Sequence, residues 1–228
     1  MSRGICGARG DCAVDNVLAM SARIEHRGPR LQLLTISPEL YLAQRGDDDP
    51  QASREHDEAP LVFAGTITNR AELLRELGDA GSGAELNDEQ LIWERYRARS
   101  IHAFERIDGS FAIALFDAHS DCLVLAADRW GSQPLYFAAG RAGWTFASEY
   151  KALLGDEAPA PTLDVAVAAY VLANKHFPAH RTLLSNVQAV GPGEFVRIRG
   201  ADVRAASYSP FQLAVDECLP EEAHAIAL

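Results

Sequence analysis

The sequence predicts an α+β fold in which sheets are sandwiched between helices. Four apolar runs follow one another at residues 109–117, 122–128, 134–139 and 144–149, with short polar turns between them, as is typical of neighbouring strands. The runs are almost continuously apolar, so we expect both faces of their sheets to be buried. Such sheets need a further layer on each side, and helices can supply it. With 228 residues, of which 48% are hydrophobic, the chain can bury a sizeable core.

The first predicted elements are a helix and two strands. Apolar residues near helical spacing predict an amphipathic helix over residues 12–24, which a Gly-Pro pair follows and ends. The apolar runs at 31–36 and 39–44 predict two strands. Residues 45–60 are polar and contain two prolines, which indicates an exposed loop.

Another strand, at residues 60–67, leads into two helices. Asn69 and Glu72 have the spacing of a helix N-cap and its reciprocal acid, so a helix should follow them. A second helix should begin near Asp88, which is itself a candidate N-cap.

The C-terminal part is predicted to add a helix and a hairpin. Residues 164–173 indicate the helix, and residues 193–200 and 201–208 indicate the two strands of the hairpin. Residues 219–228 have the apolar pattern of a helix that the end of the sequence cuts short.

Composition and charge exclude several kinds of partner. The formal net charge of −11 argues against nucleic acid held through its phosphates. No apolar run approaches the roughly 18 residues that a membrane helix needs, and the N-terminus lacks an apolar signal core, so we expect a cytoplasmic protein without a membrane partner. The four cysteines and seven histidines lack metal-ligand spacing. We therefore expect reduced thiols, no metal and no cofactor.

Eight short segments then follow in a distinctive order: ICG, HRGP, AGTITNRAELLREL, NDEQLI, IDGSFAIALFD, AADRWGSQPLYFA, FASEYKALL and GPGEFVRI. In this order and spacing they resemble the glutaminase domain of asparagine synthetase, a class II glutamine amidotransferase with the N-terminal-nucleophile hydrolase fold. The resemblance implies a four-layer αββα sandwich of two mainly antiparallel sheets between helices. It also implies a domain over residues 1–208 and a tail, 209–228, similar to the start of a linker to an absent synthetase domain.

The resemblance makes Cys6 the candidate nucleophile. In the family, this sulfur attacks the glutamine side-chain amide, which gives a thioester and releases ammonia. The family's cysteine is the first residue of the mature chain, and its own α-amino group, with a pKa near ~8, is the base. Here Met1 to Ile5 precede Cys6, so its nitrogen is an amide that cannot accept a proton. Removal of Met1 to Ile5 as a short propeptide would free it. Burial in the first strand is the alternative for Cys6.

The resemblance also assigns an oxyanion site and a glutamine site. The family's Asn-Gly-Glu segment corresponds to Ala64, Gly65 and Thr66. Gly65 can offer its backbone N–H to the oxyanion, and Thr66 stands where the segment contacts glutamine. Ala64 has no side-chain donor, and loss of one such donor typically costs about 10²–10³ in rate.

Three charged residues complete the implied glutamine site. Asp88 matches the acid that binds the α-amine, and a carboxylate is a suitable partner for an ammonium. Arg45 is the candidate for the α-carboxylate, with a solvated loop position as its alternative. Arg27 is a candidate for the rim of the pocket.

Three functions are consistent with these residues. The first is an asparagine-synthetase-type amidotransferase subunit with impaired or lost glutamine hydrolysis, acting with a separate ATP-dependent amide-forming synthetase, because the Ser-Gly-Gly-x-Asp-Ser phosphate loop of that half does not occur here. The second is an active glutaminase freed by removal of Met1 to Ile5. The third is a non-catalytic amino-acid sensor that binds its ligand through Asp88 and Arg45.

Overall fold

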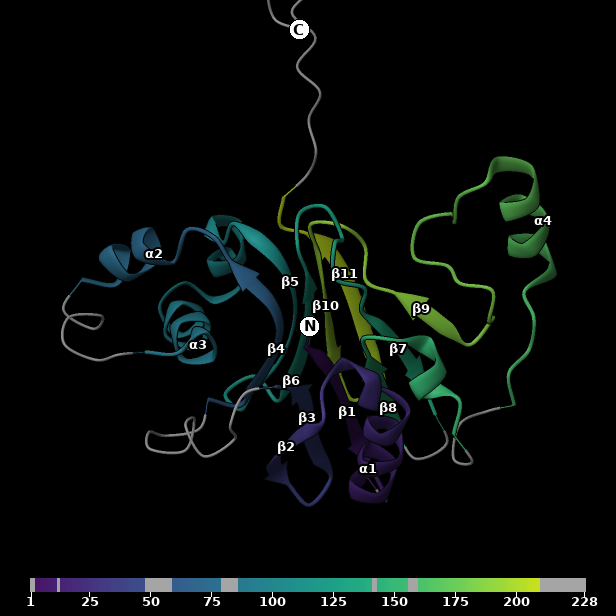
Figure 1. The fold of residues 1–228 in the computed structure, drawn as a ribbon, viewed down its shortest axis with the longest axis horizontal. Helices are drawn as coiled ribbons and strands as arrows, with labels where there is room; N and C mark the ends of the chain where they lie inside the picture. Colours follow the sequence, from purple (N-terminus) through teal and green to yellow (C-terminus); the bar gives the residue numbers. More distant parts are fainter. Residues whose placement is uncertain are drawn as a thin grey trace, which may run out of the picture.

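A computed structural model describes residues 3–11, 13–47, 59–78, 86–140, 143–155 and 160–209. Two antiparallel sheets face each other (Figure 1). The six-stranded sheet has the order β2 (Arg30–Ser37), β3 (Leu40–Gly46), β1 (Gly4–Gly10), β8 (Gly143–Ala147), β7 (Tyr136–Ala139) and β9 (Val187–Ala189). The five-stranded sheet has the order β11 (Asp202–Ser207), β10 (Glu194–Arg199), β6 (Cys122–Ala127), β5 (Gly109–Asp117) and β4 (Leu61–Ile67).

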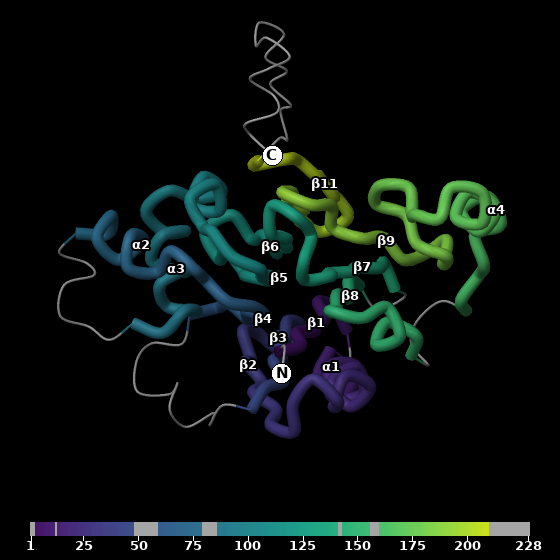
Figure 2. Tube along the Cα trace, turned by 45° about the horizontal axis from the view of Figure 1, so that its top comes forward, coloured from purple at the N-terminus to yellow at the C-terminus, as the bar shows by residue number. Residues whose placement is uncertain are grey.

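Helices cover the outer faces of both sheets. On the six-stranded sheet lie α1 (Ala13–Arg23) and the short 3₁₀ helix η5 (Tyr150–Leu153). On the five-stranded sheet lie α2 (Arg70–Leu77), α3 (Asp88–Arg99) and the 3₁₀ helix η4 (Ser100–Arg106). A further 3₁₀ turn, η1 (Glu25–Arg27), follows α1. The predicted four-layer αββα sandwich is therefore confirmed. The last helix, α4 (Val165–Asn174), belongs to neither outer layer and lies at the opposite side of the molecule from α2 and α3 (Figure 2).

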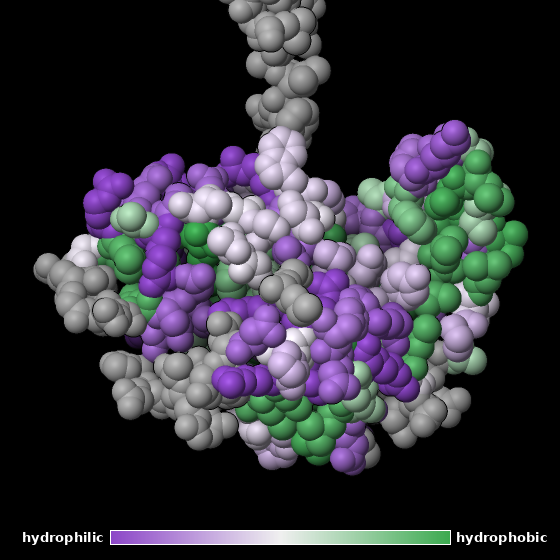
Figure 3. Space-filling model, in the orientation of Figure 1, coloured by the Kyte–Doolittle hydropathy of each residue, from purple (hydrophilic) through white to green (hydrophobic). Residues whose placement is uncertain are grey.

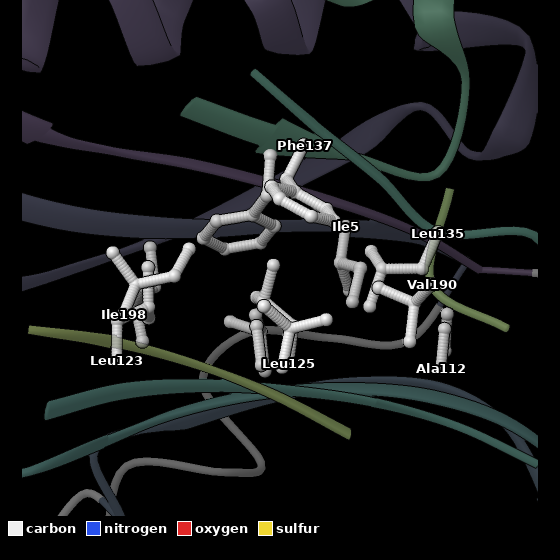
Figure 4. Close-up of a cluster of buried hydrophobic side chains, with 14 of the residues drawn as sticks. Ile5, Ala112, Leu123, Leu125, Leu135, Phe137, Val190 and Ile198 are labelled. Atoms are coloured by element: carbon white, nitrogen blue, oxygen red, sulfur yellow. The ribbon is translucent and has the colours of Figure 1, made fainter. Parts of the chain in front are cut away.

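The main core lies between the two sheets. Ile5 of β1 points into it, together with side chains of β5, β6, β7 and β10 (Figure 4). Every residue of β6 is buried, as is the centre of β5, so the prediction of burial on both faces is confirmed for these two strands. It is wrong for β7 and β8, which are only partly buried. Because side chains alternate between the faces of a strand, the neighbour of Ile5, Cys6, points into the other layer, between the sheet and α1.

Two predicted helix starts differ in detail from the structure. Asn69 is the N-cap residue of α2, but its side chain makes no capping bond. It bonds instead to the carbonyl of Arg106 and the N–H of Asp108, so it links α2 to the loop before β5. The N-cap of α3 is Asn87 rather than Asp88, with a reciprocal bond from Gln90 that forms a capping box. Since α3 begins at Asp88, the carboxylate of Asp88 is left available for an ion pair.

Other predictions were incomplete or fall outside the described residues. The short strand β9 lies in a segment for which the sequence pattern predicted no element. The hairpin of β10 and β11 is confirmed by its antiparallel register. The expected terminal helix at 219–228, most of the polar loop at 45–60, Cys12 and Cys218 lie outside the described residues.

A buried carboxylate holds the crossover from one sheet to the other. Asp128 follows β6 of the five-stranded sheet, and β7 of the six-stranded sheet begins shortly after it. Its carboxylate accepts hydrogen bonds from the backbone N–H groups of Phe111 (3.0 Å), Trp130 (2.9 Å), Ser132 (3.1 Å) and Gln133 (3.1 Å). A buried polar group is tolerated when hydrogen bonds satisfy it in this way.

Candidate active site

The candidate nucleophile lies in the middle of a strand. Cys6 pairs with Ala43 of β3 on one side and with Ala147 of β8 on the other. Its side chain is 0% exposed, and its Sγ lies 3.9 Å from the carbonyl oxygen of Val17 in α1. Burial raises the pKa of the Cys6 thiol to about 12, although the positive charge of Arg45 acts in the opposite direction. The thiol is therefore protonated at neutral pH.

The residues that precede Cys6 are part of the folded sheet. Ile5 is 0% exposed in the core between the sheets. Its N–H donates to the Oγ of Ser148 at 3.0 Å, and its carbonyl accepts from the N–H of Ser148 at 2.8 Å. Gly4 pairs with Arg45 of β3. The nitrogen of Cys6 is thus a peptide nitrogen within a paired and buried strand.

The two arginines implied in the site are engaged with protein groups. The Nε of Arg45 donates to the Oγ of Ser21 at 2.8 Å, and its Nη1 donates to the carbonyl of Pro29 at 3.2 Å. Arg27 pairs through its Nε with the carboxylate of Glu149. Arg27 also packs against the start of β1, since a Cβ built on Gly4 would lie 2.7 Å from its Cδ.

The implied acid is likewise engaged. The carboxylate of Asp88 forms an ion pair with Arg70, which also donates to the carbonyl of Leu86. At the end of β4, Thr66 is exposed. Gly65 has φ +142°, and a Cβ there would lie only 1.9 Å from the carbonyl oxygen of Ser110, so this position requires glycine.

Sequence reasoning missed a second group of polar residues at the start of β1. The Nη1 of Arg3 lies 2.8 Å from the Oε1 of Glu89, and the Nε2 of Gln44 donates to the same oxygen at 3.1 Å. The Oε1 of Gln44 accepts from the N–H of Phe63 at 2.9 Å. This group joins the start of β1 to α3, beside Asp88. Alternation along β1 predicts only that Arg3 shares a face with Ile5 and not with Cys6; it gives no sign of the pairing with Glu89.

The charged site residues lie at the start of β1, and Gln44, the neighbour of Arg45, bonds to Glu89, the neighbour of Asp88. Cys6, Arg45 and Arg27 lie on the side of α1, whereas Asp88 lies at the start of α3 with Arg3 and Glu89 close by. Within the ranges described above, no group of three or more His, Cys, Asp or Glu side chains is placed to hold a metal ion. In the same ranges, no helix has both the length and the apolar character to cross a membrane.

Comparisons with known proteins place the chain in a family. The model of the family described as "Glutamine amidotransferase domain" matches residues 2–209. A protein of Mycobacterium bovis named "Putative asparagine synthetase (glutamine-hydrolyzing)" is 29% identical over 223 residues, which covers 86% of this chain and 33% of that protein. Asparagine synthetase 1 of Saccharomyces cerevisiae is 35% identical over 149 residues, which covers 61% of this chain and 26% of the yeast enzyme.

A solved structure supports the fold. The glutamine phosphoribosylpyrophosphate amidotransferase of B. subtilis, in complex with ADP and GMP, superposes with a TM-score of 0.61 at 14% identity and covers 92% of this chain and 49% of that one. The chain spans only about a third or less of the length of the curated relatives named above. From the matched family and the two-sheet sandwich, the chain belongs to the class II glutamine amidotransferases, as a domain of the asparagine synthetase type.

Proposed function

We propose that this domain has impaired or lost glutamine hydrolysis and acts with a separate ATP-dependent synthetase of the asparagine-synthetase type that forms an amide. The observation that carries the first half is the position of Cys6. Its thiol is fully buried against α1, and its nitrogen belongs to a peptide bond in the middle of a sheet.

Two requirements of the reaction are unmet at this position. Attack on a glutamine amide needs a thiolate, and a thiol with a pKa of about 12 supplies almost none at neutral pH. The attack also needs a base close to the sulfur, and a peptide nitrogen cannot accept the proton. The buried side chain leaves no route by which glutamine reaches the Sγ without movement of α1 or β1.

The groups that would bind glutamine support the same proposal. Arg45 already bonds to Ser21 and Pro29, and Asp88 is already paired with Arg70. Ala64 is 0% exposed between the sheets and offers no side-chain donor to an oxyanion. A ligand would have to share these groups with their internal partners, which also disfavours the amino-acid sensor as the function.

The active-glutaminase alternative would require a different N-terminal strand. Removal of Met1 to Ile5 would take a fully buried isoleucine out of the main core and break its two hydrogen bonds to Ser148. The start of β1 therefore resembles a structural part of the sandwich more than a propeptide that is cut away.

The partner is proposed from the relatives. They bear the name asparagine synthetase, and this domain corresponds to about a third or less of their length. In this proposal the remaining function resides on another chain, which this domain supports structurally. The acceptor carboxylate would be amidated there with free ammonia as the nitrogen source.

Intact mass and ammonia release test the proposal on the purified chain. We expect the bond between Ile5 and Cys6 to remain intact, and ammonia release from glutamine to equal that of Cys6→Ala. Cys122→Ala, at the other described buried thiol, is the matched control. Mature protein that begins at Cys6 and releases ammonia in a manner that Cys6→Ala abolishes would contradict it. A synthetase assayed with this chain should use ammonium chloride but not glutamine. Use of glutamine would contradict the loss of glutamine hydrolysis, and a synthetase that this chain neither binds nor stimulates would contradict the partnership.

A further inference from the structure

A hollow with a volume of about 240 Å³ lies between α1 and η5, on the outer face of the six-stranded sheet. Its floor is formed by small side chains on three neighbouring strands, Ala8 of β1, Thr145 of β8 and Ala138 of β7. Because these side chains are short, the two helices that pack over the strands leave a space between them. The exposed apolar surface of α4, at the edge of the molecule in Figure 3, is a separate feature, since no residue of α4 lines this hollow.

The hollow is also separate from the candidate active site. None of the residues that the family resemblance assigns to the nucleophile, the oxyanion site or the glutamine site lines it. It lies beside Ala8 and Arg9, near the end of β1, whereas the charged residues of the candidate site lie at the start of that strand. A strand rises about 3.3 Å per residue, so the positions of Gly4 and Arg9 are roughly 16 Å apart. A ligand in the hollow would therefore occupy a second site of the domain.

An arginine with an unsatisfied nitrogen forms part of the wall. Arg23 lies in the last turn of α1, and its partly exposed side chain lines the hollow. Its Nη1 is buried and has no hydrogen-bond partner among the described residues. A Cβ built on Gly155, another residue of the wall, would lie 3.3 Å from this nitrogen. An unpaired buried donor on a charged group is costly, so a carboxylate that entered the hollow could accept from the guanidinium without displacing a described acceptor.

The charges around the hollow favour a ligand with a single carboxylate. A guanidinium matches the planar carboxylate with two parallel N–H donors. Arg9 also lines the hollow, but its guanidinium is paired with Asp121 and stands over the ring of Phe116. Asp11 and Asp15, which are exposed and lie before and in the first turn of α1, line the same hollow. They would repel a second negative charge, so a dicarboxylate or a phosphate fits less well than a monocarboxylate.

Most of the remaining wall is apolar. Met20 of α1 and Ala152 and Leu153 of η5 contribute to it, and Ala19 of α1 contributes at an exposed position. A methionine side chain adapts readily to the shape of a ligand. The volume is below the roughly 300–1,000 Å³ of pockets that enclose drug-sized ligands. The hollow therefore suits a short aliphatic chain rather than a large ring system.

We propose that this hollow binds a small aliphatic monocarboxylate, with its carboxylate at Arg23 and its chain against Met20 and Leu153. Two sources share this chemistry, namely an aliphatic α-amino acid and the corresponding acid without the amine. For the amino acid, Asp11 or Asp15 offers a partner to the ammonium group. A bound ligand would link α1 to η5, because these two elements form the walls. The proposal does not depend on whether the domain hydrolyses glutamine.

Isothermal titration calorimetry of the full chain with isocaproate and with leucine tests the proposal. We expect at least one of these two acids to bind with a Kd in the micromolar to millimolar range, as suits so small a ligand. The uncharged isocaproamide should bind about tenfold more weakly than isocaproate or worse, since it lacks the charge that pairs with Arg23. Tighter binding of leucine would identify the amino acid as the source, and tighter binding of isocaproate would identify the simple acid.

Two variants of the wall locate the binding. Arg23→Gln removes the charge and should weaken binding about tenfold or more. Ala19→Phe adds a ring at an exposed position of the wall, where it can fill the hollow without disturbing the core, and it should weaken binding as well. The matched control is Arg199→Gln, at an exposed arginine of β10 in the other sheet, which should bind as the wild type does. Circular dichroism should show all three variants folded.

Three results would overturn the proposal. The first is the absence of binding by both acids at millimolar concentrations. The second is binding that neither Arg23→Gln nor Ala19→Phe weakens, because the acid would then lie elsewhere, for example in the glutamine site. The third is equal binding of isocaproamide and isocaproate, because the guanidinium of Arg23 would then contribute nothing to recognition.

Discussion

Removal of Met1 to Ile5 is the most informative perturbation of this domain. The variant is a chain with Cys6 as its N-terminal residue, and the control is a chain that begins at Arg3 and keeps every described contact of β1. If the start of β1 is structural, the Cys6 variant should be strongly destabilised. If it is a propeptide, the variant should be stable and active.

The expected loss can be worked from the contacts of Ile5 and Arg3. Loss of a fully buried isoleucine costs about 2–5 kcal/mol, as for replacement by alanine. The two hydrogen bonds with Ser148 contribute about 0.5–1.5 kcal/mol each. The partly exposed ion pair of Arg3 with Glu89 adds about 0–1 kcal/mol. The total is about 3–9 kcal/mol, a large part of the roughly 5–15 kcal/mol by which domains are stable.

Thermal unfolding followed by circular dichroism measures this loss. A domain of this size loses roughly 2–4 °C in Tm for each kcal/mol, so a fall of at least about 6–12 °C is expected. Ile5→Val, which removes a single methylene group, should cost about 0.5–1.5 kcal/mol. This smaller loss shows how strongly stability depends on packing at residue 5. A Cys6 variant that melts within a few degrees of the control and releases ammonia from glutamine would refute both the structural reasoning and the proposed loss of activity.

Three further predictions concern buried or paired groups. Because burial raises the pKa of Cys6 to about 12, iodoacetamide should alkylate it slowly in the native protein at pH 8 and rapidly after denaturation, as followed by peptide mass spectrometry; fast native labelling would contradict the buried position. Burial acts to raise the pKa of Glu149, but hydrogen bonds from Arg27 and its other basic neighbours lower it to about 2, so its contribution to stability is present above about pH 4.5 and is lost as the pH falls toward 2. Glu149→Gln should flatten that part of the curve of unfolding free energy against pH, and an unchanged slope would exclude the ion pair as its source. Asp128→Ala leaves four buried or partly buried backbone N–H groups without this acceptor and should cost about 3 kcal/mol or more in urea unfolding, whereas a loss below 1 kcal/mol would show that water replaces the carboxylate.

The strands were predictable from the sequence because burial on both faces leaves an unbroken apolar run. The segments at β5 and β6 show this directly. The face of β1 on which Cys6 lies was harder to predict from the sequence, since it depends on the strand partners and not only on alternation. Arg3 and Glu89 are 86 residues apart, so no local pattern could have shown that they pair.

Local rules also failed where tertiary contacts compete. Asn69 has the right spacing for a capping residue, but its side chain bonds to the backbone of Arg106 and Asp108 instead. The sequence of α4 predicted a helix correctly, yet its apolar composition suggested burial that the single chain does not provide. The apolar composition of α4 indicates that its surface is covered in the assembled protein, but it does not indicate which molecule covers it.

The crossover at Asp128 has a consequence for how the domain comes apart. The side chain of Asp128 accepts hydrogen bonds from N–H groups of β5 and of the segment before β7, and the backbone carbonyl of Asp128 accepts from the N–H of Gly193 ahead of β10. Neither sheet can slide or peel away while these bonds persist. Both should therefore melt in one cooperative step, with the amides of Phe111 and Gln133 among the last to exchange their hydrogens with solvent. The same hydrogen bonds fix the length of the crossover segment after Asp128. An insertion between Asp128 and Gln133 should therefore be tolerated far less readily than one in a surface loop.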